Sequence, residues 1–209
     1  DAFNPVTGKS RLLRDYKKNL LLINGLNNMA LQPNWLLASQ VGANGDTPVA
    51  LDTGMKSYVA GTTNQIDNTF TAESSPPYFG SRQITWRYAE GAAVANLQEI
   101  GAGWSPLEGS TCVSRALIEN PQTGDPVTVA PQPDELLDAT YLMRYYPPSG
   151  DATGTVFFDG VEYNYIVRAA NVTGATEWGS NIGQEVGSVS GSGNWVAYGD
   201  DGDIGAIEG

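Results

Sequence analysis

The dipeptide Asp159-Gly160 constrains the fold most strongly, because it lies between two strand-like runs, 155–158 and 161–167. A type I′ turn, one of the common two-residue connections between antiparallel strands, requires φ > 0 at both positions, which Asp and Gly tolerate better than most residues. The sequence therefore predicts a β-hairpin with a type I′ turn. Four residues of the second run are expected to share one face: Val161, Tyr163, Tyr165 and Val167.

Alternation elsewhere predicts that most of the chain forms short strands. Within 81–89, the residues Ile84, Trp86 and Tyr88 fall on one face of a strand and polar residues fall on the other. A turn is expected after this strand, with 93–101 returning beside it. The remaining expected strands are 35–41, 55–60, 111–118, 127–130 and 139–146. We expect a mainly β fold with an antiparallel β-sandwich-like domain.

Three segments depart from the strand pattern. Leu22, Leu26 and Met29 have the spacing of one helical face, which predicts a short N-terminal helical element ending before Pro33. Residues 61–77 are rich in Thr, Asn and Ser, which indicates a long exposed connection. Residues 174–209 include ten Gly among 36 residues and bury little surface to offset the entropy of ordering. The expected parts are a basic arm or strand (1–18), a β-rich core domain (19–173) and a Gly/Ser-rich acidic tail or linker (174–209).

The chain is acidic, with a formal net charge of −12 and an isoelectric point near 4.2. Such a surface repels phosphate backbones, so we expect no nucleic-acid partner. No apolar run approaches the ~20 residues of a membrane-spanning helix, and no signal peptide is recognisable, so no membrane association is expected. Five of the 11 basic residues nevertheless lie in the first 18 positions: Lys9, Arg11, Arg14, Lys17 and Lys18.

The residue types that most active sites need are scarce. The chain has no His, and Cys112 is its single Cys, which excludes His-based nucleophilic catalysis, the usual zinc sites and an intrachain disulfide. We therefore expect no cofactor, no metal and no enzymatic activity. The acidic turn at 200–203 lacks the spacing of a calcium-binding EF-hand loop. Glycan hydrolysis remains an alternative, because it needs only two carboxylates; the candidates are Glu90, Glu99, Asp134, Glu135 and Asp138.

Aromatic residues are concentrated in the expected strands, where their alternation favours packing in the core and at subunit interfaces. The alternative is an exposed face that binds sugars. The residues concerned are Trp86, Tyr88, Trp104, Tyr141, Tyr145, Tyr146, Tyr163 and Tyr165.

Several short motifs resemble, in order and spacing, a family of bacteriophage tail or tail-fibre-associated virion proteins. The first is Asn19-Leu20 followed by Gly25-Leu26-Asn27, and the second is Gln40-Val41-Gly42 followed by Pro48. The others lie at 76–78, 86–92, 99–104, 114–118, 142–148 and 168–172. Together they extend over residues 18–183.

This resemblance implies a non-enzymatic structural subunit of a virion, in the tail or a tail-attached fibre, which is assembled in the bacterial cytoplasm. The implied partners are other virion proteins and further copies of the chain, with a trimer favoured because trimers are common in such appendages. A capsid decoration or head-fibre protein, and a carbohydrate-binding module that recognises a host glycan, are the alternatives. The expected assembly contacts are the basic N-terminal residues and two tail aromatics: Arg11, Arg14, Lys17, Lys18, Trp178 and Trp195.

Overall fold

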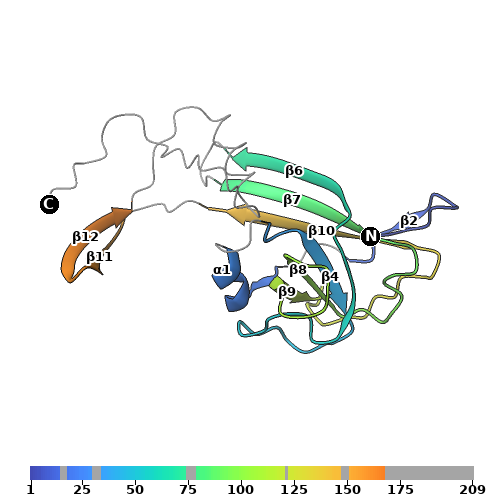
Figure 1. Ribbon diagram of the computed structural model, residues 1–209. Helices are drawn as coiled ribbons and strands as arrows, with labels where there is room; N and C mark the ends of the chain where they lie inside the picture. Colours follow the sequence, from blue (N-terminus) through green and yellow to red (C-terminus); the bar gives the residue numbers. More distant parts are fainter. Residues whose placement is uncertain (15–17, 30–33, 74–78, 121, 147–150, 168–209) are drawn as a thin grey trace.

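A computed structural model of the chain describes residues 1–14, 18–29, 34–73, 79–120, 122–146 and 151–167. These residues form two five-stranded antiparallel sheets and a separate two-stranded hairpin (Figure 1). One short helix, α1 (Ile23–Met29), accompanies them. The predicted mainly β fold with a short N-terminal helical element is confirmed. The predicted tail, 174–209, lies outside the described residues.

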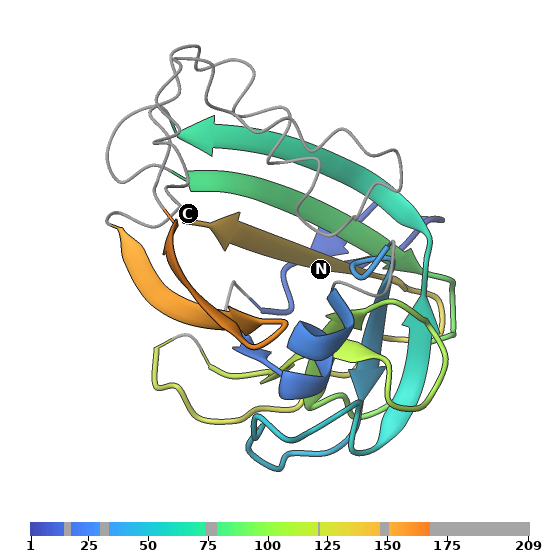
Figure 2. The ribbon, with the colours of Figure 1, turned by 60° about the vertical axis from the view of Figure 1, so that its left-hand side comes forward.

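The first sheet has the strand order β2-β1-β10-β7-β6. Its long members are β6 (Gln65–Glu73), β7 (Phe79–Tyr88) and β10 (Leu136–Tyr145), which curve together over the second sheet (Figure 2). The two short strands β1 (Ala2–Phe3) and β2 (Ser10–Arg11) extend it at one edge. Part of the basic segment 1–18 is therefore paired within this sheet.

The second sheet has the strand order β3-β9-β8-β4-β5. Its strands are short, and they are β3 (Leu20–Leu21), β4 (Ala38–Gly42), β5 (Tyr58–Thr62), β8 (Glu99–Gly103) and β9 (Cys112–Leu117). Helix α1 packs on this sheet, where a Cβ on Gly25 would lie 2.5 Å from the Val113 Cα. Only glycine permits an approach this close at that position.

The core lies between the sheets and follows the period-2 alternation of β7. Ile84, Trp86 and Tyr88 are all at most 1% exposed, as the sequence predicted. Trp86 donates its indole N–H to the Leu37 carbonyl oxygen at 3.0 Å, and the Tyr88 hydroxyl lies 2.9 Å from Ser39 Oγ. Both aromatic side chains thus keep a polar partner while they are buried.

Three local predictions were wrong. Residues 61–77 are not mainly a connection, because 65–73 form β6, which pairs with β7 over its whole length. Residues 93–101 do not return beside β7; after a turn, 99–103 form β8 in the other sheet. Residues 127–130 form no strand and contribute only an isolated bridge between Leu97 and Val129.

The predicted hairpin is confirmed as β11 (Ala152–Phe158) and β12 (Val161–Val167). The turn residues Asp159 and Gly160 have φ values of 49° and 79°, the positive values that a type I′ turn requires. The hairpin forms a sheet of its own and stands apart from the sandwich in Figure 1.

Candidate functional site

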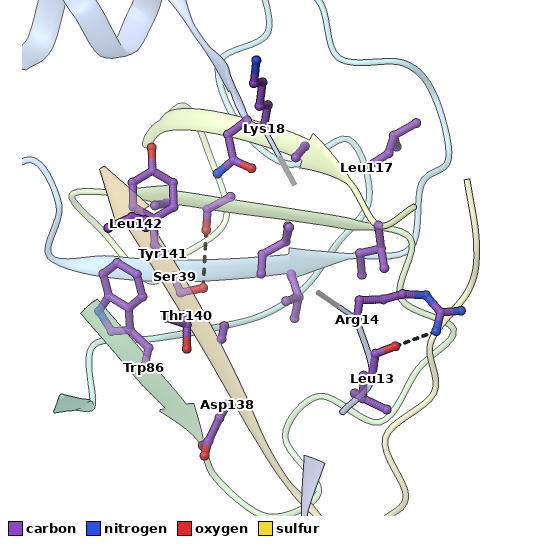
Figure 3. A pocket seen from close by; sticks show the side chains of 18 of the residues that line it. Leu13, Arg14, Lys18, Ser39, Trp86, Leu117, Asp138, Thr140, Tyr141 and Leu142 are labelled. Atoms are coloured by element: carbon purple, nitrogen blue, oxygen red, sulfur yellow. Dashed lines mark hydrogen bonds between the residues drawn. The ribbon is translucent and has the colours of Figure 1, made fainter. Parts of the chain in front are cut away.

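A cavity of about 810 Å³ opens between the two sheets (Figure 3). It lies at the edge where β10 and β9 face each other, opposite the edge where the chain passes from β5 to β6. Apolar residues from both sheets and the intervening loops form its walls, among them Val41, Leu97, Ala102, Leu117, Val129, Leu137 and Ala139. Its size falls within the range of pockets that hold ligands or partner segments.

The β10 edge that faces this cavity is largely unpaired. Strand β1 covers it only at Leu136 and Leu137, whereas β7 pairs with the other edge from Leu137 to Tyr145. The Asp138 N–H donates to the Asp1 carbonyl oxygen at 2.8 Å, and the Asp1 amino group donates to the Asp138 carbonyl oxygen at 2.9 Å. The backbone groups of Asp138 therefore point toward the β1 side.

Backbone groups in an antiparallel strand point to alternate sides, so those of Thr140, Leu142 and Arg144 point the same way as those of Asp138. No backbone partner meets them there within the described part of the chain. All three residues line the cavity. The cavity is consequently a groove along an open strand edge, and such an edge is a template for an added strand.

Basic side chains surround this groove. Arg14, Lys18 and Arg144 are exposed and line it, as Figure 3 shows for the first two. Arg144 also lies over the Phe79 ring, 5.0 Å from its centroid. The nearby Asp138 carboxylate is held by Arg87 through two hydrogen bonds of 2.7 and 2.6 Å. Asp1 and Glu119 also line the cavity, so the rim combines three exposed basic side chains with these acidic groups on a chain that is acidic overall.

The hairpin presents an apolar face without a covering partner among the described residues. The cross-strand pairs Val156–Tyr163 and Phe158–Val161 lie on this face, together with Tyr165 opposite Gly154. Phe158 is 70% exposed and Tyr163 is 45% exposed. The opposite face is more polar, with Thr155 opposite Asn164. An isolated two-stranded hairpin is marginally stable in water, so this face is suited to contact with another surface.

A buried polar network lies on the outer face of the second sheet. Arg115 Nε donates to Glu99 Oε2 at 2.5 Å, and Arg115 Nη1 donates to Asp52 Oδ2 at 2.8 Å. The Lys56 ammonium lies 2.6 Å from Asp52 Oδ1. Burial acts to raise the pKa of Asp52, but hydrogen bonds from Lys56 and the Val49 N–H and the charge of Arg115 hold that pKa below its usual value. The network joins the loop 44–57 to the sheet.

Cys112 lies beside this network and is fully buried. Its thiol donates to Gln40 Oε1 at 3.2 Å. Burial raises the pKa of the thiol to about 12, so it carries almost no thiolate at neutral pH. Its surroundings are those of a packed core residue.

The structure places the predicted assembly residues in different surroundings. Arg11 forms an ion pair with Glu135, at 2.6 Å between Nη2 and Oε2. Arg14 and Lys18 lie at the groove, where Arg14 Nη1 donates to the Leu13 carbonyl oxygen at 2.5 Å. The other three lie outside the described residues: Lys17, Trp178 and Trp195. The role of all six in assembly stays a prediction.

The carboxylates considered for glycan hydrolysis are mostly engaged in structural contacts. Glu99 is fully buried in the Arg115 network, and Asp138 is paired with Arg87. Glu135 is paired with Arg11, and Asp134 accepts a hydrogen bond from the Asn4 amide at 2.7 Å. The described residues contain no cluster of three side chains arranged to hold a metal ion.

The aromatic residues separate into two groups. Trp86 and Tyr88 are buried in the core, and the Tyr141 ring meets the edge of Trp86 at 6.4 Å between centroids. Tyr163 and Tyr165 are exposed on the hairpin. Sequence reasoning identified the hairpin but not the groove. The groove arises because β1 is much shorter than β10 and leaves most of its edge unpaired. This pairing joins segments that are far apart in the sequence, so no local pattern reveals it.

Comparisons with protein-family models, curated proteins and solved structures found no match. No helix within the described ranges has the length and apolar character needed to span a membrane.

Proposed function

We propose that this chain is a non-enzymatic structural subunit of a bacteriophage virion, located in the tail or a tail-attached fibre, where it assembles with other virion proteins. The motifs between residues 18 and 183 support the association with phage tails. The main support for a structural role is the exposed apolar face of the β11–β12 hairpin, the segment that follows β10 in the chain. An exposed apolar face of this kind is suited to burial against a neighbouring subunit.

The chemistry of the described residues agrees with a scaffolding role. The ion pairs of Arg115 with Glu99 and Asp52 are buried and hold a loop to the sheet. Three exposed basic side chains, Arg14, Lys18 and Arg144, line the groove together with apolar residues, which suits contact with an acidic protein surface. A formal net charge of −12 disfavours packaged nucleic acid as the partner.

The proposal is tested with particles of the phage that encodes the chain. We expect the protein in purified particles by mass spectrometry, in a fixed ratio to known tail proteins, and antibody labelling on the tail by electron microscopy. Detection only in lysate, with none in purified particles, contradicts the virion role. Labelling on the head instead supports a capsid decoration protein.

A matched pair of variants tests whether the hairpin supports incorporation. Phe158→Asp places a charge on the apolar face, whereas Thr155→Asp places the same charge on the polar face. We expect the first variant to be depleted from particles and the second to be incorporated normally. Exposed Tyr163 and Tyr165 are the groups that would favour glycan recognition, and specific signal on a glycan array would support that role instead.

A further inference from the structure

We propose that the groove along β10 accepts the β11–β12 hairpin of a second copy of this chain, which adds to the first sheet beside β10. This inference rests on the proposed role as an assembling subunit and identifies the two surfaces that join copies. The hairpin and the groove are different surfaces, so the contact is heterologous, and successive contacts close into a ring where the rotation permits.

The lengths of the two backbone edges agree. The uncovered part of β10 runs from Ala139 to Tyr145, and each hairpin strand has the same length, seven residues. Thr140, Leu142 and Arg144 direct their N–H and carbonyl groups into the groove. Addition of a strand there satisfies these groups with main-chain hydrogen bonds, as in other proteins that bind by strand addition.

The side-chain surfaces also agree. Docking beside β10 turns one face of the hairpin toward the space between the sheets, where the cavity walls are apolar. The apolar hairpin face carries Val156, Phe158, Val161, Tyr163 and Tyr165, which are between 44% and 70% exposed. Burial of apolar surface is favourable in proportion to the area removed from water, so this face gains most from entering the cavity.

The charges are complementary. The hairpin carries Asp159 and Glu162 and, between 151 and 167, has no Lys or Arg. The groove carries the exposed basic side chains of Arg14, Lys18 and Arg144. Opposite charges on two such surfaces accelerate their encounter and favour one orientation.

A second copy is the occupant because the hairpin stands away from its own groove. In Figure 1 it lies beyond the end of β10, separated from the sandwich, and neither of its strands pairs with a strand of the two five-stranded sheets. The same contact within one chain requires β11 to fold back on β10 and would give a closed monomer. The two arrangements are distinguished by which chains become linked.

Cysteine cross-linking provides this distinction. One variant carries Leu142→Cys, whose side chain lies on the outer face of β10, and another carries Thr155→Cys on the polar face of the hairpin, which docking turns to that same side. Native Cys112 is fully buried and remains in both. We expect an equimolar mixture of the two variants to form a disulfide-linked heterodimer under mild oxidation. The matched control replaces Leu142→Cys by Thr69→Cys on β6, the opposite edge of the same sheet, and is expected to give at least about tenfold less heterodimer.

A chain with both substitutions completes the test. Exchange between copies predicts cross-linked dimers or larger closed species from the double variant. A cross-linked monomer from the double variant, with no heterodimer from the mixture, shows closure within one chain and overturns the proposal. Absence of both products overturns it as well.

Association of the unmodified protein is measured independently by light scattering over a range of concentrations. Tyr163→Asp is expected to weaken self-association about tenfold or more, because central aromatic residues dominate such interfaces. Asn164→Asp, on the other hairpin face, is expected to have less effect. Melting temperature serves as the folding control. A protein that is monomeric at every concentration overturns this inference, whereas absence of the chain from particles overturns the proposed virion role without affecting the in vitro result.

Discussion

Replacement of Arg115 by Met removes a fully buried positive charge from the polar network on the second sheet. Arg115 and Glu99 have side chains that are 0% exposed, and Asp52 has a side chain that is 1% exposed. Asp52 would keep the ammonium of Lys56 at 2.6 Å. Glu99 would keep only the backbone N–H groups of Ser57 and Lys56, at 2.9 and 3.3 Å, from among its partners in the described residues.

The magnitude follows from this difference between the two carboxylates. Removal of one partner from a buried ion pair typically costs about 3–5 kcal/mol, because the remaining charge is left buried and unpaired. Met fills much of the volume of the Arg side chain, so we expect little contribution from a cavity. We therefore expect Arg115→Met to lower the free energy of unfolding by about 3–5 kcal/mol, which is a large part of the ~5–15 kcal/mol typical of a domain.

Urea unfolding followed by circular dichroism measures this loss, with an unchanged m-value as evidence that the same surface is exposed. Adding Glu99→Gln to Arg115→Met removes the unpaired charge and should recover about 1 kcal/mol or more, a coupling that a double-mutant cycle measures. Arg11→Met, in an exposed ion pair, is the control and should cost less than about 1 kcal/mol. A loss below about 1 kcal/mol for Arg115→Met, or no recovery in the double variant, would refute this account of the network.

Three further predictions concern single sites. Gly160→Val forces a β-branched residue into φ near 79° and should open the hairpin. We expect faster amide exchange in residues 152–167 and little change in the melting temperature of the sandwich. Equal exchange rates in the variant and the unmodified protein would contradict the turn geometry. The hydrogen bond from Arg11 holds the pKa of Glu135 at about 2, below its ordinary value of 4.5. This pair therefore stabilises the fold fully above pH 4.5, and the stabilisation is lost as the pH falls toward 2. Glu135→Gln should flatten the pH dependence of the unfolding free energy between these two pH values. Cys112 should react with thiol reagents only as fast as the protein opens, and immediate labelling of the native protein would be inconsistent with its burial.

Local chemistry determined the parts of the fold that the sequence could predict. The hairpin depends on two turn residues and on alternation within 16 positions, so it was identified together with its turn. The inward face of β7 was identified because Ile84, Trp86 and Tyr88 recur at every second position. The apolar residues Leu22, Leu26 and Met29 indicated the short helix, although Leu26 is 52% exposed in it.

The missed features depend on pairing between distant segments. Strand β6 is polar and exposed on much of its surface, so it lacks the apolar alternation from which a strand is predicted. It forms a strand because its backbone pairs with β7. The groove exists because β1 pairs with β10 at only two residues, and the Arg115 network joins Asp52 to Arg115 across 63 positions. No local pattern encodes either arrangement.

The order of the strands also determines when each sheet can form during synthesis. Every strand of the second sheet lies between Leu20 and Leu117, so that sheet can assemble once this segment has left the ribosome. The first sheet requires Ala2 to pair with Leu137, and β1 cannot find its partner until β10 has emerged. At roughly 5–20 residues per second, the N-terminal strand waits for several seconds or longer beside a half-built sandwich. Such late, long-range pairing slows folding, and it leaves the apolar inner face of the second sheet open to other nascent copies during that interval.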